Sequence, residues 1–589
     1  MRTFLRLLGF LRPYRRPLIG SLLLAWLAMG MTVLIPLLIG ATVNAIQEER
    51  RDDILPLVLG LLGAGVLRLG LTVGRRLIAG KVSLAVEFDL RQAFYEHLQE
   101  LELGFFDSQQ TGQLMSRATV DLQSIRFFLG YGLIWVSQSA LTLLFAATLM
   151  FILNPLLAAL ALAPVPFLVV TATRYSRRNR PAEQEVQQRI GEVTASAEES
   201  ISGIRIVKAF ARERHMLGRF RHSVNRVFEQ SMVSARLQAF YTPLMGFLPN
   251  LGLAAVLLVG GNQVISGDIK SGELAAFASY IAMLSGPVRW LGMSLSMAQR
   301  ATASGNRMFE VLDRKPAMQS PPGAAPLPEG RGRVSLQRVA LGYGGSVPAL
   351  SGIDLEVEPG RTIALVGPTA SGKTSLVGLL PRLYDPSEGK VVIDEADIRD
   401  VDLASLRHEI AFVADDSFLF SDTVAANIAY ARPEATREEI EDAAKRAQAH
   451  DFIKRLPDGY DTVVGERGLT LSGGQRQRVA IARALVAEPR ILILDDATSS
   501  VDARTESQIK AGLREAMEGR TTFIVAHRLS TISLADEIVV MDRGRIVDRG
   551  THEQLLERCP LYEEIAEKGL EDSVYLQRDL EEREELAKL

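Results

Sequence analysis

Long apolar stretches with few charges most constrain how this chain can fold. Residues 17–47, 127–173 and 237–267 carry no charged side chain, and residues 54–74 and 274–299 carry one arginine each. A helix needs about 20 apolar residues to cross a bilayer. The stretch at 127–173 is too long for one crossing, and Asn154-Pro155 near its middle indicates a turn. The sequence therefore predicts an all-α domain of six helices in the lipid bilayer.

The six predicted spans cover residues 17–46, 54–74, 127–153, 155–173, 239–266 and 274–299. Arginines precede the first span and follow the second and fourth, so the positive-inside rule places both termini in the cytoplasm. The first span is longer than the apolar region of a signal peptide and lacks a small-residue cleavage site. We therefore expect it to stay attached, in an integral protein of a bacterial-type inner or cell membrane.

The rest of the chain is organised around these spans. The connections at 75–126 and 174–236 are charged, poor in Gly and Pro, and compatible with membrane helices that continue into the cytoplasm. We expect a transmembrane domain over residues 1–310, a Pro/Gly/Ala-rich linker over 311–332, an α/β domain over 333–570 and a charged tail over 571–589.

Charge and cysteine content exclude several classes of function. The 589 residues carry a net charge of −3, which gives no general case for nucleic acid as a partner. The single cysteine, Cys559, excludes an intrachain disulfide framework and any metal site built from several thiolates. The chemistry must therefore come from other residue types.

A phosphate-binding motif follows a predicted buried strand in the α/β domain. The strand at 363–366 leads into GPTASGKT and then a helical stretch, which is the context that the P-loop pattern GxxxxGK[ST] requires. Glycines let backbone amides close around phosphates, and the helix N-terminus adds partial positive charge. Lys373 would reach the β- and γ-phosphates of ATP, and the Thr374 hydroxyl would bind Mg²⁺. The predicted nucleotide-binding residues here are Gly367, Pro368, Thr369, Ala370, Ser371, Gly372, Lys373, Thr374 and Ser375.

Two other segments carry candidate site residues. A predicted buried strand at 491–494 ends in Asp495 and Asp496, and Asp495 is the expected magnesium carboxylate downstream of a P-loop. The segment LSGGQ at 471–475 precedes a helix. It can form a nest of backbone amides for phosphate, and its alternative interpretation is a simple helix N-cap.

The LSGGQ pentapeptide resembles the signature motif of the ATP-binding cassette (ABC) family. The whole chain except its tail is similar to an ABC exporter half-transporter, in which six helices are fused to one P-loop nucleotide-binding domain; FFD at 105–107 and GIRIVKAF at 203–210 are family-like too. The resemblance implies that Tyr343 stacks on adenine, that His527 touches the γ-phosphate and that Asp502 belongs to the D-loop.

The same resemblance implies a partner. In the family two cassettes pair head to tail, and each ATP lies between one P-loop and the signature of the other subunit. A second half-transporter is therefore expected, and the residues lent to its site are Leu471, Ser472, Gly473, Gly474, Gln475 and Asp502.

Two positions depart from the family pattern. Asp496 stands where the family usually has a glutamate that orients the attacking water, and Asp415 replaces a glutamine that helps to hold Mg²⁺ and water. Misplacing a catalytic group by about 1 Å can cost about 10²-fold in rate. Slow hydrolysis at this chain's own site, with Asp496, His527 and Asp415 as its catalytic residues, resembles the degenerate-site subunit of a heterodimeric exporter. A homodimer that uses Asp496 as its base, or an ATP-gated regulator or channel, are the alternatives.

Two arginines inside predicted spans bear on the cargo. Arg68 and Arg289 either line a wet substrate cavity or lie near helix ends and extend to the interface. A positive cavity would favour anionic or amphipathic cargo such as lipids or peptides over cationic drugs.

Overall fold

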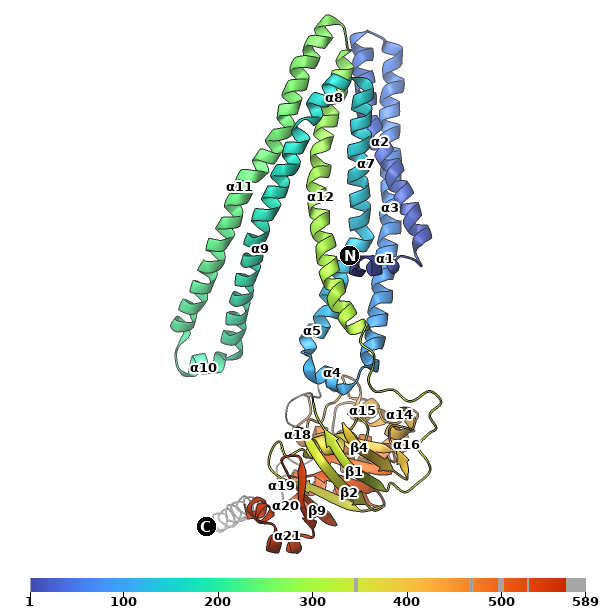
Figure 1. Cartoon of the computed structure of the whole chain (residues 1–589), viewed down its shortest axis with the longest axis vertical. Helices are drawn as coiled ribbons and strands as arrows, with labels where there is room; N and C mark the ends of the chain where they lie inside the picture. Colours follow the sequence, from blue (N-terminus) through green and yellow to red (C-terminus); the bar gives the residue numbers. More distant parts are fainter. Residues whose placement is uncertain are drawn as a thin grey trace. The chain divides into compact units, whose positions relative to one another are not determined.

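The computed structural model describes residues 2–343, 348–465, 468, 470–495, 503–526 and 529–567 (Figure 1). It divides into two compact units, one formed by residues 1–99 and 111–314 and the other by residues 100–110 and 315–589. The predicted charged tail at 571–589 lies outside the described residues.

The first unit is helical. Its elements are α1 (Arg2–Gly9), α2 (Arg15–Gln47), α3 (Arg51–Glu100), α5 (Thr111–Ser116), the π-helix η1 (Arg117–Asp121), α6 (Leu122–Phe127), the π-helix η2 (Phe128–Gly132), α7 (Leu133–Leu153), α8 (Pro155–Leu162), α9 (Pro164–Ser202), α10 (Ile204–Ala209), α11 (Glu213–Ser266) and α12 (Ser271–Leu312).

Five of the predicted spans lie in helices that are long and apolar enough to cross a membrane. Among the described residues these are Arg15–Gln47, Arg51–Glu100, Thr111–Leu153, Pro155–Ser202 and Glu213–Ser266. The sixth span stays a prediction, because the apolar part found in α12 is the shorter stretch Ser271–Leu284.

The expected turn after the third span is confirmed, and so is the continuation of helices beyond the spans. The Asn154 side chain caps α8 by accepting hydrogen bonds from the amides of Leu156 and Leu157, both at 3.1 Å. Helices α3, α9 and α11 are 50, 39 and 54 residues long, well beyond the roughly 20 needed to span a bilayer. Helices α9 and α11 run side by side, with α10 at the turn between them (Figure 1).

Helices α2 and α12 cross at two glycines. A Cβ atom on Gly40 would overlap the carbonyl oxygen of Gly272, so only glycine allows this approach. Asn44 Oδ1 accepts a hydrogen bond from the Gly272 amide at 2.6 Å, and the Tyr280 hydroxyl donates to the Val33 carbonyl at 2.8 Å. Small residues with interhelical hydrogen bonds are a typical way to join membrane helices.

The second unit is an α/β domain to which one short segment from the first third of the chain belongs. Its elements are α4 (Leu103–Ser108), β1 (Val334–Leu341), β2 (Leu350–Val357), β3 (Thr362–Val366), α13 (Lys373–Leu379), β4 (Glu388–Ile393), β5 (Ala396–Asp397), α14 (Leu403–His408), β6 (Ile410–Val413), α15 (Val424–Ala429), α16 (Arg437–Arg446), α17 (His450–Ile453), the 3₁₀ helix η3 (Gly459–Asp461), α18 (Gly473–Val486), β7 (Ile491–Asp495), α19 (Ala503–Met517), β8 (Thr521–Val525), α20 (Leu529–Ile532), β9 (Glu537–Asp542), β10 (Arg545–Gly550) and α21 (His552–Arg558).

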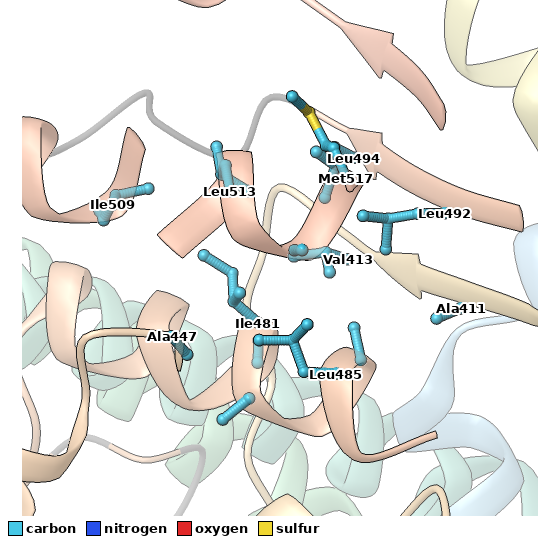
Figure 2. Close-up of a cluster of buried hydrophobic side chains, with 14 of the residues drawn as sticks. Ala411, Val413, Ala447, Ile481, Leu485, Leu492, Leu494, Ile509, Leu513 and Met517 are labelled. Atoms are coloured by element: carbon cyan, nitrogen blue, oxygen red, sulfur yellow. The ribbon is translucent and has the colours of Figure 1, made fainter. Parts of the chain in front are cut away.

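Two sheets build this unit. Within the described residues, the smaller sheet has the antiparallel order β2-β1-β4-β5, and the larger has the order β10-β9-β3-β8-β7-β6, in which all pairs from β9 to β6 are parallel. Strands β3, β7 and β8 of the larger sheet are buried at every position, so both of its faces are covered there, as is typical of parallel sheets. Side chains that alternate along β6 and β7 enter different clusters, and Figure 2 shows the cluster to which α18 and α19 contribute Ile481, Leu485, Ile509 and Leu513.

The parallel strands end together at one edge of the sheet. Leu365 of β3 pairs with Val525 of β8, Val525 pairs with Asp495 of β7, and Leu494 pairs with Val413 of β6. The residues that follow these strands therefore leave the sheet at the edge where α/β proteins bind ligands.

Candidate nucleotide-binding site

The loop between β3 and α13 is closely packed, and several of its residues have positive φ angles. Strand β3 is buried at every position, and the chain then takes positive φ angles of 153° at Gly367, 65° at Ala370 and 100° at Gly372 before α13 begins. A Cβ atom on Gly372 would lie 2.8 Å from the Ala349 carbonyl oxygen, and one on Gly367 would overlap the carbonyl oxygen of Met541. The glycines of the predicted P-loop are thus required by the path of the backbone.

Lys373 is held across this loop. Its side chain is 5% exposed, and Nζ donates hydrogen bonds to the carbonyl oxygens of Gly367 at 2.8 Å and Pro368 at 2.9 Å. Ser371 is buried with its Oγ 3.4 Å from Nζ, whereas Pro368, Thr369 and Ala370 are exposed at the tip of the loop. The ammonium group is therefore fixed beside the first turn of α13, where the helix dipole already favours an anion.

Two of the three residues predicted to bind Mg²⁺, Thr374 and Asp495, meet at the same place, and the role of the third, Asp415, stays a prediction. The Thr374 hydroxyl donates to Asp495 Oδ1 at 3.3 Å, although 121 residues separate them, because β3 and β7 lie on either side of β8 and end at the same edge of the sheet. Asp495 is 8% exposed. Within the described residues no cluster of three or more His, Cys, Asp or Glu side chains can hold a metal ion. One hydroxyl and one carboxylate fit Mg²⁺, which takes few protein ligands and otherwise binds phosphate oxygens and water.

Tyr343 lies beside α13. Its hydroxyl donates to Ser375 Oγ at 3.0 Å, and its ring is 53% exposed. The ring centroid lies 5.0 Å from that of Tyr384, with the planes at 81°, which is an edge-to-face contact. The structure thus brings the predicted adenine-stacking residue next to the predicted P-loop and leaves ring surface accessible.

The LSGGQ segment forms the start of α18. Ser472 Oγ accepts from the Gln475 amide at 3.3 Å, and Gln475 Oε1 accepts from the Ser472 amide at 2.9 Å. These reciprocal bonds are a capping box, which caps α18, and the interpretation of the segment as a phosphate-binding nest stays a prediction. Leu471 and Gly474 are buried, and Ser472 is exposed.

The structure describes some of the other predicted site residues and not the rest. Asp415 is exposed two residues after β6 and therefore lies at the same sheet edge as Asp495. Arg68 is exposed on α3. Asp496, Asp502 and His527 lie outside the described residues, and so does the side chain of Arg289.

Two protein families match different parts of this chain, one its helical part and the other its α/β part. The family described as "ABC transporter transmembrane region" matches residues 18–288, and the family described as "ABC transporter" matches residues 350–499. An uncharacterised ABC transporter ATP-binding protein, YknU of Bacillus subtilis (strain 168), is 40% identical over 567 residues, covering 96% of this chain and 97% of that protein. The chain belongs to the ABC transporter family.

Two further relatives narrow the family to its exporters. An ATP-dependent lipid A-core flippase of Syntrophus aciditrophicus (strain SB) is 36% identical and covers 95% of this chain and 93% of its own length. The solved structure of a bacterial Atm1-family ABC exporter with ATP bound has a TM-score of 0.78 and 31% identity over 94% of this chain and 98% of that one. This ABC transporter is an ATP-driven exporter, an ATPase-coupled protein that resides in a membrane.

The structure of this ABC exporter adds two residues that the motifs did not indicate. The Tyr384 hydroxyl donates to Asp107 Oδ2 at 2.6 Å across 277 residues of sequence. Asp107 stands in the family-like FFD stretch and Tyr384 in RLYDP, between the P-loop helix and β4. Neither stretch has a spacing rule that predicts its partner, so only the fold could join them.

Proposed function

We propose that this chain is one subunit of a dimeric exporter that moves hydrophobic or amphipathic solutes, such as drugs, lipids or peptides, out of the cytoplasm or the inner leaflet by alternating access. Both termini would lie in the cytoplasm. The observation that carries the proposal is the P-loop assembly, in which buried Lys373 is fixed across the loop and Thr374 meets Asp495. The names of the related flippase and Atm1-family exporter support the direction of transport.

The described residues fit ATP with Mg²⁺. Lys373 and the N-terminus of α13 supply positive charge for phosphates, Thr374 and Asp495 supply oxygen ligands for the ion, and Tyr343 offers a ring for the base. A bound Mg²⁺ ion would neutralise phosphate charge as it develops during hydrolysis. The chain's own residues thus bind and orient the nucleotide.

We further propose that the partner is a different chain. Asp496 has a side chain one methylene shorter than glutamate, and Asp415 places a negative charge at the edge where the family has a neutral amide. Both departures belong to the site built on this chain's P-loop. The segment Leu471–Gln475 and Asp502, which would complete the partner's site, follow the family pattern. The expected result is one slow and one competent ATP site in a heterodimer.

Purification of this chain alone in lipid nanodiscs tests the proposal. We expect magnesium-dependent ATP binding that Lys373→Ala removes, together with slow turnover that Asp496→Asn barely changes. Robust and cooperative ATPase activity that Asp496→Asn abolishes would refute the heterodimer and favour a homodimer. ATP-dependent solute uptake into inverted vesicles that contain both subunits separates an exporter from an ATP-gated channel.

A further inference from the structure

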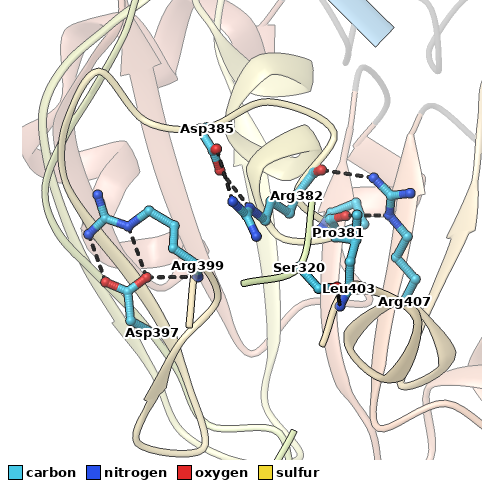
Figure 3. A network of polar contacts seen from close by, with 8 residues as sticks. All are labelled: Ser320, Pro381, Arg382, Asp385, Asp397, Arg399, Leu403 and Arg407. Carbon is cyan, nitrogen blue, oxygen red and sulfur yellow. Dashed lines mark hydrogen bonds and ion pairs between the residues drawn. The ribbon is translucent and has the colours of Figure 1, made fainter. Parts of the chain in front are cut away.

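The loop that carries Tyr384 is held by Arg407 from outside and by an ion pair within the loop. Arg407 of α14 donates from Nε to the Pro381 carbonyl at 3.1 Å and from a terminal nitrogen to the Arg382 carbonyl at 3.0 Å. The Arg382 guanidinium in turn pairs with Asp385 at 2.7 Å (Figure 3). Charged donors make stronger hydrogen bonds than neutral ones, so residues 381–385 have little freedom. Tyr384 therefore projects from a fixed support.

Tyr384 contacts two functional parts of the second unit at once. Its ring meets Tyr343 edge to face at 5.0 Å, and Tyr343 is tied through its hydroxyl to Ser375 of α13. Its hydroxyl donates to the Asp107 carboxylate at 2.6 Å, next to α4. Burial and then this hydrogen bond raise the pKa of Tyr384, so the phenol keeps its proton at neutral pH. A continuous contact path therefore runs from α13 to α4.

Two further contacts join the segment that contains α4 to the rest of the second unit. The Glu102 carboxylate accepts a hydrogen bond from the Ala317 amide at 3.1 Å. A Cβ atom on Gly104 would lie 3.9 Å from Tyr384 Cε1, so the backbone of α4 rests on the Tyr384 ring. The same tyrosine therefore packs against the backbone of α4 and donates a hydrogen bond to Asp107.

We propose that Tyr384 is a positioning residue that makes the attachment of α4 depend on the base bound at Tyr343. This inference rests on the proposed function, because it takes Tyr343 as the platform for adenine. A purine stacked on the open face of Tyr343 restricts the motion of that ring. The restricted Tyr343 ring limits the motion of Tyr384 through their edge-to-face contact. Tyr384 in turn limits the motion of α4 through its hydrogen bond to Asp107 and its packing against Gly104. The ligand class that produces the effect is a purine nucleoside triphosphate, and phosphates without a base do not.

Hydrogen–deuterium exchange of residues 100–110 in the full chain in nanodiscs measures this dependence. We compare no ligand, Mg²⁺-ATP and Mg²⁺-tripolyphosphate, which offers phosphates without a base. An aromatic contact stabilises by an amount that corresponds to about twofold to tenfold in an equilibrium. ATP is expected to slow exchange of this segment by about that factor, and tripolyphosphate is expected to leave it unchanged.

Variants separate the hydrogen bond from general packing. Tyr384→Phe keeps the ring and removes the donor, so ATP should still bind while most of the ATP-dependent protection disappears. Asp107→Ala should reproduce this loss, whereas Asp107→Asn keeps an acceptor oxygen and should retain much of the protection. The control is Tyr95→Phe, at a tyrosine that is 64% exposed on α3, and it should behave as the wild type does.

The outcomes distinguish this inference from the proposed function. Equal protection by ATP and tripolyphosphate, or full protection in Tyr384→Phe, would overturn the role of Tyr384 while leaving ATP binding intact. Faster exchange in Tyr384→Phe by the same factor with and without ATP would also overturn it, because that result describes a merely structural contact. Failure of the wild type to bind ATP would instead remove the proposed function.

Discussion

Gly372 shows how closely the predicted phosphate site depends on single residues. Its backbone has a φ of 100°, and a Cβ atom would lie 2.8 Å from both the Ala349 carbonyl oxygen and Leu350 Cδ2. Left-handed backbone costs a residue with a Cβ roughly 1–2 kcal/mol before any overlap is counted. The loop geometry that fixes Lys373 therefore tolerates no side chain at this position.

Gly372→Ala is expected to lower ATP affinity by at least about tenfold, because strain and overlap of about 1.4 kcal/mol or more must distort the loop. Equilibrium binding of a fluorescent ATP analogue measures the loss. The matched control is Gly360→Ala, where φ is 74° but a Cβ atom meets nothing within 4 Å. That variant should lose some stability and keep its affinity; equal losses of affinity in the two variants would contradict this explanation.

The phenol of Tyr384 gives a prediction about pH. Its folded-state pKa is raised above the ordinary value of 10.0, so its contribution to stability is present below that value and is lost as the pH rises through the folded pKa. The Tyr384 hydroxyl should therefore keep the proton that it donates to Asp107 up to about pH 10. A near-ultraviolet titration of the wild type minus Tyr384→Phe should show this tyrosine ionising only above about pH 10, and ionisation at or below that value would contradict the raised pKa.

At the scale of residues, the sequence predicts candidate site residues where a motif or the end of a buried strand specifies their position. The P-loop pattern identified Lys373 and Thr374, and the acid at the end of a buried strand identified Asp495, because chain order and strand ends determine where these groups lie. It could not identify the pair of Asp107 and Tyr384, because a hydrogen bond between residues 277 positions apart follows from tertiary packing alone. It also gave Ser472 two roles, as a helix cap and as part of a phosphate-binding nest; the structure shows the cap, and the nest stays a prediction.

At the scale of helices, hydropathy predicts where spans lie but says nothing about which helices touch. The apolar stretches match five of the long helices, and Asn154-Pro155 gives the turn before α8. The crossing of α2 and α12 depends on Gly40 and Gly272, two glycines among many in apolar sequence. The two π-helical segments, Arg117–Asp121 and Phe128–Gly132, also had no sequence signal.

Gly40→Val is expected to destabilise the first unit by about 1–3 kcal/mol, because the added methyl groups must push α12 away from α2. Gly30→Val is the matched control in the same helix, since a Cβ atom there meets nothing within 4 Å. Thermal unfolding in the same detergent should show a lower midpoint for Gly40→Val alone. Equal midpoints for the two variants would show that the crossing is not constrained as the structure indicates.

At the scale of the molecule, the proposed slow ATP site rests on two acidic departures from the family pattern, Asp496 and Asp415. If Asp496 is too short to orient water, then Asp496→Glu combined with Asp415→Gln should raise the ATPase rate of the isolated chain by about 10- to 100-fold. Steady-state phosphate release measures the rate, and the same double variant with Lys373→Ala should be inactive. An unchanged rate would mean that these two positions do not limit hydrolysis.

Magnesium should be needed for that gain. Thr374 and Asp495 offer oxygen ligands for the ion, so chelation with EDTA is expected to abolish the added turnover and re-addition of Mg²⁺ to restore it. Turnover that survives chelation would argue against the assignment of Thr374 and Asp495 as ion ligands.

Because residues 100–110 group with the cassette, the polypeptide passes between its two compact units three times, after Gln99, after Gln110 and after Arg314. A cassette expressed alone from the linker onward would therefore lack a native piece of itself. The Tyr384 hydroxyl would lose Asp107 as its acceptor, and the Ala317 amide would lose Glu102. Supplying a peptide of residues 100–110 in trans would be the natural remedy, and its binding would report on the cassette without any membrane.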